Sequence, residues 1–381
     1  FYMAGKIHPL LRTLMLGREL LNKKDCAIEI SIGHEIKYRE VDGLNDQQLV
    51  SYLRLNTYLL NRAHKIPRNK TASDQSLQPI AQRLPEGDLL ADIHQLSFAN
   101  HLVRYSEFDV YCAAADSIPC ILHEIGRIRE LNFRDAGEGT GLNLDIDKFD
   151  RHYLHLFIWD RENHKLVGAY RLGLVDQILE QQGIKGLYSS TLFSYDPKFL
   201  SNMGNSIEMG RSVIAAEYQK SMTSLLLLWK GIATFVHRNP RYTHLFGPVS
   251  ISNDYSDDAR HLLADTMALH YYDKNQAKLV AATNPLPAHQ HIKWNASLLS
   301  SLADIQLLSK VIARMDEGKG VPVLLRQYLG LNGKFVSFNV DADFNDALDG
   351  LIVVDLSKVP EKTLARYMGR VAAQEYLSLY N

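Results

Sequence analysis

The run Ser206-Ile-Glu-Met-Gly-Arg-Ser-Val-Ile-Ala215 is strand-like and carries ionisable side chains in an otherwise apolar setting. A strongly apolar helix is predicted next, over residues 221–236, with Ser221 as its N-cap and Asn239-Pro240 at its end. Residues 244–251 form the following predicted strand. This strand–helix–strand order is the centre from which the rest of the fold is predicted.

The flanking segments extend the sheet in both directions. Residues 155–159 and 166–172 are apolar strands separated by a polar turn, which predicts a hairpin, and residues 119–133 read as a helix. Residues 335–340 and 350–355 are two further strands. We therefore expect the α/β (α+β) class, with a mixed, largely antiparallel sheet flanked by helices.

The bulk composition is that of an ordinary globular chain. At 381 residues the chain is longer than one average domain, so two folded units are expected. Its 46% hydrophobic and 22% charged residues are typical of a soluble protein, and its net charge of -1 gives no case for nucleic-acid binding. No apolar stretch reaches the ~20 residues of a transmembrane helix. Cys26, Cys112 and Cys120 are widely spaced, which indicates thiols in a reducing compartment and no disulfide or zinc site.

Basic charge is concentrated at the start of the chain. Residues 1–70 contain twelve Lys and Arg but seven Asp and Glu. A basic, apolar segment of this kind can lie against an anionic membrane surface, and a solvated basic face is the alternative. We expect a cytoplasmic protein, with peripheral contact at the inner membrane as an open possibility.

Ionisable side chains gather in the middle third of the sequence. Several sit on or beside segments predicted as buried strands, where charges are costly unless they pair with each other or with a substrate. The set consists of Arg129, Phe133, Asp147, Asp150, Arg171, Glu208 and Arg211. The region 125–215 is therefore where we expect the chemistry.

In combination these motifs resemble the GNAT acyltransferase superfamily. The nearest likeness is to its branch that uses acyl-carrier-protein donors: the ornithine- or glycine-lipid N-acyltransferases, often labelled haemolysins, and the acyl-homoserine-lactone synthases. The likeness covers about residues 105–360. It is carried by the residues above and by the runs Val167-Gly-Ala-Tyr-Arg171, Leu227-Leu-Trp-Lys-Gly-Ile, Leu245-Phe-Gly-Pro-Val-Ser and Val323-Leu-Leu-Arg-Gln-Tyr-Leu.

The N-terminal segment resembles a different family. His8-Pro-Leu-Leu-Arg and Tyr52-Leu-Arg-Leu-Asn-Thr-Tyr58 are similar to the end of a lysophospholipid acyltransferase domain, whose catalytic His-x4-Asp box is not found here. With a strand predicted over residues 26–32, the resemblance implies a small α/β remnant over residues 1–65. Residues 66–104 are then a linker, and residues 105–381 the GNAT-like domain.

The GNAT resemblance implies an N-acylation, in which the attacking amine must lose its proton. Glu208 is the expected general base, Arg211 would orient it, and Phe133 would contact the acceptor. Strand residues three apart normally face opposite sides of a sheet, so we expect a bulge at Met209-Gly210 to bring Glu208 and Arg211 into one cleft.

The remaining charged residues are expected to bind the acceptor amino acid. Asp147 and Asp150 would hold its amino group, and Arg129 or Arg171 would hold its carboxylate through a bidentate contact. The alternative is a purely structural ion-pair network of four residues: Asp150, Arg171, Glu208 and Arg211.

The donor site departs from the acetyl-CoA pattern. The glycine loop that grips a pyrophosphate is replaced by Glu217-Tyr-Gln-Lys-Ser-Met222, which favours acyl carrier protein as donor over acyl-CoA. Residues 134–146 contain no Trp, which argues against lactone synthesis. The residues expected to contact the phosphopantetheine arm are Ser212, Val213, Ser221, Thr223 and Ser224.

The sequence therefore predicts an N-acyltransferase that moves a long-chain, 3-hydroxylated acyl group to the α-amine of ornithine or glycine. We expect no metal and no covalently bound cofactor; the histidines at 152, 155 and 164 lie in strand and turn surroundings. Two alternatives remain open. One is a degenerate acyltransferase fold that binds lipid or protein without turnover, and the other is a membrane-lytic protein.

Overall fold

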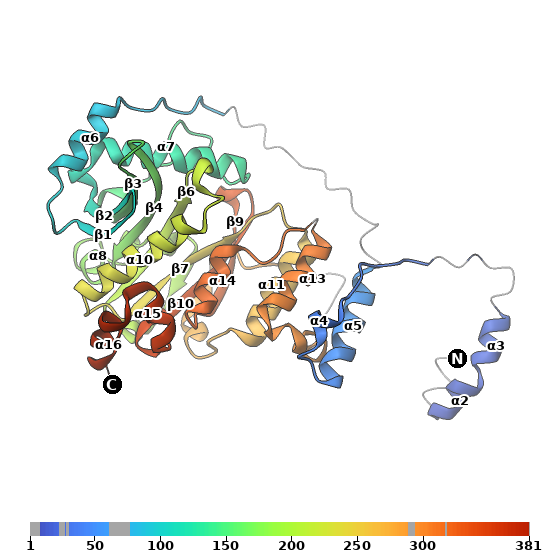
Figure 1. The fold of residues 1–381 in the computed structure, drawn as a ribbon. Helices are drawn as coiled ribbons and strands as arrows, with labels where there is room; N and C mark the ends of the chain where they lie inside the picture. Colours follow the sequence, from blue (N-terminus) through green and yellow to red (C-terminus); the bar gives the residue numbers. More distant parts are fainter. Residues whose placement is uncertain are drawn as a thin grey trace.

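An eight-stranded sheet forms the centre of the protein (Figure 1). The computed structural model describes residues 8–22, 27, 30–60, 77–288, 294–316 and 318–380. The strand order is β1-β2-β3-β4-β6-β7-β10-β9. Its strands are β1 (His101–Tyr105), β2 (Phe108–Ala114), β3 (Leu154–Asp160), β4 (Lys165–Leu174), β6 (Ser206–Ile214), β7 (His244–Ile251), β9 (Lys334–Asp341) and β10 (Ala347–Asp355). The predicted class, with a mixed and largely antiparallel sheet, is confirmed.

One pair of strands departs from the antiparallel pattern. β6 and β7 run parallel, and their pairing ends at Glu208 and Phe246. Both strands continue beyond this point, β6 over residues 209–214 and β7 over residues 247–251, without pairing to each other. We call these two unpaired stretches the β6–β7 divergence. Two strand edges that face each other without a shared ladder leave backbone donors and acceptors for a ligand to use.

Different helices cover the two faces of the sheet. α10 (Met222–Arg238) lies across β1 to β4 on one face, where its apolar side joins the largest core cluster. α7 (Pro119–Asp135) lies against β4 and β6 on the opposite face. Both helices were predicted, and the N-cap of α10 is Ser221 as expected.

An inserted layer, which was not predicted from the sequence, covers the other half of the α7 face. It contains α8 (Val175–Gln182), α9 (Pro197–Met203) and a small sheet of β5 (Phe193–Tyr195) and β8 (Val280–Ala282). Its apolar side chains pack on β7, β9 and β10. The layer closes this face of the sheet over the strands that carry the candidate site.

Further helices complete the core on the α10 side. They are α11 (Asp257–His270), α12 (Ala296–Leu299), α13 (Ile305–Met315), α14 (Val323–Gly330), α15 (Glu361–Met368) and α16 (Arg370–Ser378). α15 packs directly on α10, and α11 packs on α13. Figure 1 shows α14 between α10 and the pair α11–α13.

The N-terminal helices α4 (Tyr38–Val41) and α5 (Asp46–Leu60) pack onto this helical end of the protein. Tyr52 and Leu55 of α5 are fully buried in the main core. They follow α2 (Pro9–Leu14) and α3 (Leu16–Leu21), which carry exposed leucine side chains.

Two features differ from the expected N-terminal organisation. The strand predicted over residues 26–32 falls partly outside the described residues, and its described positions, 27 and 30–32, are not in a strand. The range assigned to a linker contains α6 (Glu86–Gln95), which packs on α7, and β1, which pairs with β2. The pattern over residues 88–102 is typical of a helix or an extended segment, so the sequence did indicate structure within that range.

No single helix among the described residues is long and apolar enough to cross a membrane. The bent pair Ala296–Ala303 and Ile305–Met315 meets that test by combined length and composition, with an angle of 114° between its halves.

Candidate active site

A buried chain of ion pairs links α7 to the centre of the sheet. Arg129 of α7 and Arg171 of β4 are fully buried, and Asp150 is 1% exposed. Arg129 Nη1 lies 2.8 Å from Asp150 Oδ1, and Arg171 Nη1 lies 3.3 Å from the same oxygen. Burial opposes the charge of Asp150, but the two guanidinium groups hold its pKa well below its usual range. Asp150 is therefore a carboxylate held between two cations.

Asp147 extends this chain to β6. It is the N-cap of the short turn Lys148–Arg151 and forms a capping box with Asp150. Its Oδ1 accepts a hydrogen bond from Arg171 Nη1 at 2.7 Å. Its Oδ2 lies 3.6 Å from Arg211 Nη2. The predicted acceptor-binding aspartates and arginines thus form one network, with Asp147 (24% exposed) nearer the surface than Asp150.

Arg211 ends the network and lies between aromatic rings. Its Nε is 3.3 Å from Asp145 Oδ2, yet both atoms are buried and neither has a hydrogen-bond partner. The guanidinium stacks 4.8 Å from the Tyr188 ring centroid and 4.5 Å from that of Phe344. Phe133 contacts Phe344 edge to face at 6.3 Å, so this predicted residue does lie beside the arginine. Asp145, by contrast, was missed from the sequence.

Glu208 is enclosed by hydrogen-bond donors. It is 1% exposed, and the Tyr153 hydroxyl donates to its Oε2. The backbone N–H groups of Tyr188 and Ser189 donate to its two oxygens at 3.1 and 2.6 Å. Three donors saturate much of the acceptor capacity of this carboxylate. Its role as general base stays a prediction.

The expected contact between Glu208 and Arg211 is not formed. Tyr188 lies between the two side chains, because its amide faces Glu208 while its hydroxyl accepts from Arg211 Nη1 at 3.3 Å. The carboxylates near Arg211 are Asp145 and Asp147. Arg211 does not contact Glu208, so the prediction that Arg211 orients Glu208 is wrong. For the same reason, the proposed four-residue structural network holds only without Glu208.

A β-bulge does occur in β6, two residues later than predicted. Arg171 pairs with Gly210 and Ala169 pairs with Val213, so Arg211 and Ser212 together oppose one residue of β4. Arg211 adopts the left-handed conformation, with φ of 50°. The bulge brings the Arg211 side chain to the face that carries Glu208, as expected, but it uses Arg211 itself and not Gly210.

A second group of carboxylates lies across the β6–β7 divergence from Arg211. We call Glu138, Asp341 and Asp349 the acidic cluster. Asp349 is 2% exposed, and the Ser250 hydroxyl donates to it at 2.6 Å. Burial raises the pKa of Asp349 to about 7, as does repulsion from Asp341 and Glu138. Burial and the charges of Asp254 and Asp341 likewise raise the pKa of Glu138 to about 7.

The acidic cluster was not found from the sequence, although one signal was present. Asp349 interrupts the apolar strand run Ala347-Leu-Asp-Gly-Leu-Ile352, which is the pattern that singled out Glu208. Glu138 had no such signal, because it lies in a polar loop after α7 and only the fold brings it close to β9 and β10.

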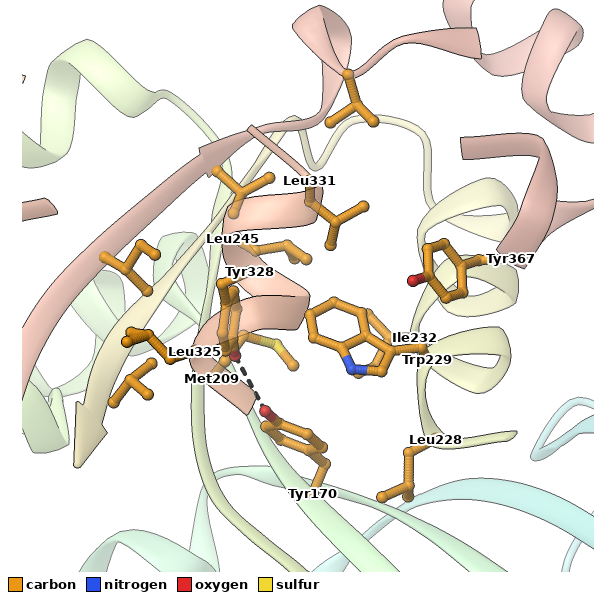
Figure 2. Close-up of a cluster of buried hydrophobic side chains, with 14 of the residues drawn as sticks. Tyr170, Met209, Leu228, Trp229, Ile232, Leu245, Leu325, Tyr328, Leu331 and Tyr367 are labelled. Carbon is orange, nitrogen blue, oxygen red and sulfur yellow. Dashed lines mark hydrogen bonds between the residues drawn. The ribbon is translucent and has the colours of Figure 1, made fainter. Parts of the chain in front are cut away.

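Two of the expected donor-binding residues follow the bulge in β6. Ser212 bonds the Tyr170 hydroxyl, which also lies 3.1 Å from the hydroxyl of Tyr328 on α14. Figure 2 shows this tyrosine pair against Met209 and Leu325. Val213 packs toward α7 instead. The α10 side of the divergence is thus apolar, with a few hydroxyl groups.

The other expected donor residues form the start of α10. Ser221 Oγ accepts from Thr223 N at 3.2 Å, which completes the helix cap. Ser224 is 2% exposed, and its hydroxyl donates to the Tyr218 carbonyl at 3.3 Å. The Ser221 and Ser224 hydroxyls therefore have structural partners, and their contact with a donor stays a prediction.

The three histidines noted in the sequence form hydrogen bonds with three different local partners. His152 Nε2 lies 2.9 Å from the Gly186 carbonyl, and His164 Nδ1 lies 2.6 Å from Glu86. His155 Nε2 donates to the Asp150 carbonyl at 2.8 Å, and burial together with Arg129 lowers its pKa to about 4. Within the described ranges no group of three or more His, Cys, Asp or Glu side chains is arranged to hold a metal ion.

Comparison with known proteins agrees with this geometry. The acetyltransferase (GNAT) domain model matches residues 128–230, which span the arginine–aspartate network, Glu208 and most of α10. The glycine N(alpha)-acyltransferase of Phocaeicola vulgatus is 26% identical over 311 residues, covering 77% of this chain and 93% of that protein. The glycine N(alpha)-acyltransferase of Bacteroides thetaiotaomicron is also 26% identical over 311 residues, with 90% of its length covered.

These likenesses fit the mixed, mostly antiparallel sheet flanked by helices, which is consistent with a GNAT fold. The matched domain and the two relatives together support an N-acyltransferase that acts on an amino acid. The chemistry available at the site is consistent with that activity. Cations and carboxylates lie on one face of the β6–β7 divergence, and an apolar surface lies on the other.

Proposed function

We propose that the protein transfers a long-chain acyl group from the thioester of an acyl carrier protein to the α-amine of a small amino acid of the glycine or ornithine type. The observation that carries this proposal is the β6–β7 divergence, with its polar and apolar sides. An acyl thioester that enters between the strands would present its carbonyl carbon to an amine on the polar side. Both relatives are named as glycine N(alpha)-acyltransferases, which supports glycine as the first acceptor to test.

The apolar side supports a long acyl chain. Leu325 and Tyr328 of α14 lie near Met209 at the start of the divergence, and Trp229 of α10 packs edge to face against Tyr328 (Figure 2). These side chains are at most 2% exposed, and a mostly apolar wall of this kind with few hydroxyl groups suits contact with a hydrocarbon chain. The Tyr170–Tyr328 hydroxyl pair offers a polar contact for a 3-hydroxyl group on that chain.

A basic groove supports a carrier protein as donor. The groove has a volume of about 680 Å³ and begins at the start of α14, where Lys310, Lys319 and Arg326 line it. Lys310 and Lys319 lie 3.7 and 3.6 Å from Glu40 and Asp254, and Arg326 is exposed. A basic groove beside α14, whose Leu325 and Tyr328 lie near Met209, suits an acidic protein partner, since complementary charge steers association.

A peripheral membrane contact belongs to the same proposal. Leu10, Leu14, Leu16 and Leu21 of α2 and α3 are more than half exposed. Exposed leucines on a basic segment suit an anionic lipid surface, where the lipid product would be delivered.

The test is an acyl-transfer assay with the full chain, a long-chain 3-hydroxyacyl carrier protein, and glycine, ornithine and other amino acids as acceptors. We expect release of the carrier thiol and one N-acyl amino acid, identified by mass spectrometry. Charge reversal at Arg326 should raise the KM for the acyl carrier protein and leave the KM for a short acyl-pantetheine unchanged.

Two outcomes would replace the proposal. Binding of acyl carrier protein without transfer to any amine, in a folded sample, would support a binding module. Leakage of anionic vesicles without an acyl donor would support the membrane-lytic alternative.

A further inference from the structure

The acidic cluster faces the polar side of the β6–β7 divergence. Asp349 of β10 lies opposite Ser250 of β7 in one strand pairing and opposite Asn339 of β9 in the other. Leu351, two residues along the same strand, packs with Phe246 in the core beneath the inserted layer. Because alternate strand residues share a face, Asp349 lies on the face that carries Glu208 and Arg211.

Arg211 borders the acidic cluster from the other side of the divergence. Its guanidinium stacks on Phe344, which lies in the turn between β9 and β10. Its charge lowers the pKa of Asp349 and of Glu138 against the stronger effect of burial. Arg211 is already shared by Asp145 and Asp147. It therefore cannot neutralise the acidic cluster.

The acidic cluster lacks a cation of its own. Asp349 is 2% exposed and Asp341 is 6% exposed. In the part of the chain that the structure describes, no lysine or arginine forms an ion pair with Glu138, Asp341 or Asp349. Buried carboxylates without a cation are costly, so such groups either hold a proton or bind a cation from outside. The pKa values of about 7 for Asp349 and Glu138 have the same cause, because a buried carboxyl group without a cation keeps its proton more readily.

A second observation indicates what the missing ligand carries. The Arg211 side chain is 9% exposed, and its Nε has no hydrogen-bond partner. An amino acid between the two sides of the divergence would supply a carboxylate for this donor and an ammonium group for the acidic cluster. A buried guanidinium with one unused N–H donor, beside several carboxylates that lack a cation, is thus complementary to a zwitterion.

We propose that Asp349 takes the proton from the acceptor's ammonium group and is the general base of the acyl transfer, while Glu138 and Asp341 hold that ammonium beside it. This inference rests on the function proposed above and assigns the base to Asp349 in place of Glu208. Ser250 is then a positioning residue, because its hydroxyl fixes one oxygen of Asp349. Asp349 is the catalytic residue of this set because it touches the reacting amine.

The acceptor nitrogen loses two protons during the transfer. One proton passes from the ammonium nitrogen to the Asp349 carboxylate, which leaves a neutral amine. The amine nitrogen attacks the thioester carbonyl carbon, the C–N bond forms, and the C–S bond breaks. The thiolate leaves with the electron pair of that bond and takes up the second nitrogen proton. Asp349 returns its proton to solvent, so that no oxidant, reductant or further co-reactant is consumed.

The experiment compares the pH dependence of kcat/KM for the full-length wild type, Asp349→Asn, Ser250→Ala and Glu208→Gln. The donor is a long-chain acyl carrier protein and the acceptor is glycine. Wild type should show an acidic limb near pH 7. Asp349→Asn should lower kcat/KM by about 100-fold or more and remove that limb, since a positioned general base contributes about 10²–10⁴-fold. Its remaining activity should rise with pH as the free amine form accumulates.

Ser250→Ala gives a readout that a structural role would not produce. The Ser250 hydrogen bond lowers the pKa of Asp349, so its loss should move the acidic limb to higher pH. Asp346→Asn, an exposed acid in the same β9–β10 turn, is the matched control and should leave the profile unchanged. If Asp349→Asn does not fold, the shift in Ser250→Ala still tests the proposal.

The outcomes distinguish a wrong assignment of the base from a wrong proposed function. A wild-type chain that transfers acyl groups, with Asp349→Asn retaining both rate and profile, overturns Asp349 as the base and leaves the proposed function standing. Loss of the acidic limb in Glu208→Gln, with none in Asp349→Asn, would do the same and return the role to Glu208. A folded wild-type chain that transfers to no amine overturns the proposed function itself.

Discussion

The Tyr153 hydroxyl donates to Glu208 and at the same time accepts from the Tyr188 amide at 2.9 Å. Tyr153 is 1% exposed, and burial, together with the neighbouring Glu208, raises its pKa well above the usual value. The phenol is therefore a proton donor at any working pH. Its two hydrogen bonds hold Glu208 against the loop that carries Tyr188, and the Tyr188 ring stacks on the Arg211 guanidinium.

This contact predicts the behaviour of Tyr153→Phe. Removing the hydroxyl takes one donor from Glu208 Oε2 and leaves the Tyr188 N–H with its 3.1 Å bond to that oxygen alone, which should cost about 1–3 kcal/mol of unfolding free energy. Glu208→Gln should cost a similar amount, because an amide presents N–H groups to donors that need an acceptor. Urea unfolding measures both losses. A variant with unchanged stability and abolished activity would instead indicate that Glu208 reacts with the substrate.

Replacing Asp150 should lower the unfolding free energy more than replacing Tyr153 or Glu208. Asp150→Asn leaves Arg129 and Arg171 buried with less compensating charge, and breaking such a pair costs about 3–5 kcal/mol. Denaturant unfolding at neutral pH checks this. The control is Asp257→Asn, whose carboxylate is 76% exposed and pairs with Arg260 at the surface. That variant should change the unfolding free energy by less than about 1 kcal/mol. Equal effects in the two variants would contradict a stabilising role for the buried pair.

The sequence predicted the order of the central elements because their signals are local. The hairpin of β3 and β4, the capped apolar helix α10 and strands β7, β9 and β10 all show period-two or period-3.6 patterns within one segment. Arg129, Asp147, Asp150, Arg171 and Arg211 form one network, the expected contact between Arg211 and Glu208 is not formed, and the roles of these residues stay predictions. That contact depended on the position of a bulge, which is set by pairing with β4 and has no strict sequence code.

The parts that were missed depend on long-range placement. β5 and β8 are 3 residues each, too short for a periodic pattern. Glu138 and Asp341 lie far apart in sequence, and their shared environment exists only once the loop after α7 packs beside the β9–β10 turn. Tyr188 could not be ranked above other tyrosines, because its role follows from its place between Glu208 and Arg211.

The ion pair between Glu40 and Arg314 predicts how the N-terminal helices are held. Arg314 Nη2 donates to both Glu40 oxygens at 2.7 and 2.8 Å, and its Nη1 donates to the Tyr52 hydroxyl at 2.9 Å. Arg314→Ala should speed amide hydrogen exchange in α4 and α5 and leave β3 and β4 protected. Lys310→Ala is the control, since its ammonium is 47% exposed and lies 3.7 Å from Glu40. Unchanged exchange in both variants would contradict docking through this pair.

The acidic cluster predicts that stability falls as the pH rises. The pKa values of Asp349 and Glu138 are raised to about 7, so the folded protein binds more protons than the unfolded chain between their ordinary values and pH 7. The unfolding free energy should therefore decrease from about pH 4 to pH 7 through these groups. Asp150 has the opposite sign, because its lowered pKa makes stability fall only below about pH 4.

Thermal unfolding as a function of pH measures this effect. Asp349→Asn should flatten the decline and raise the melting temperature above pH 7, because the buried charge is removed. A decline of the same size in wild type and in Asp349→Asn would show that this carboxyl does not titrate in that range.

Gly247 allows β7 to approach β6 closely at the point where their pairing ends. A Cβ atom at this position would lie 2.1 Å from the Met209 carbonyl oxygen, a backbone atom that cannot rotate away. Gly247→Ala should therefore push β7 from β6 where their pairing ends, with a cost of about 1–3 kcal/mol as for other overpacked sites. The same displacement should lower kcat, since a thioester carbonyl between the strands would be misplaced relative to the amine.

Gly210→Ala is the matched control in β6. No atom lies within 4 Å of its added Cβ, so the unfolding free energy should stay within about 1 kcal/mol of wild type or increase slightly. Urea unfolding and acyl transfer measured on both variants test the comparison. A Gly247→Ala protein with wild-type stability and rate would mean that the spacing of β6 and β7 at this point does not govern the reaction.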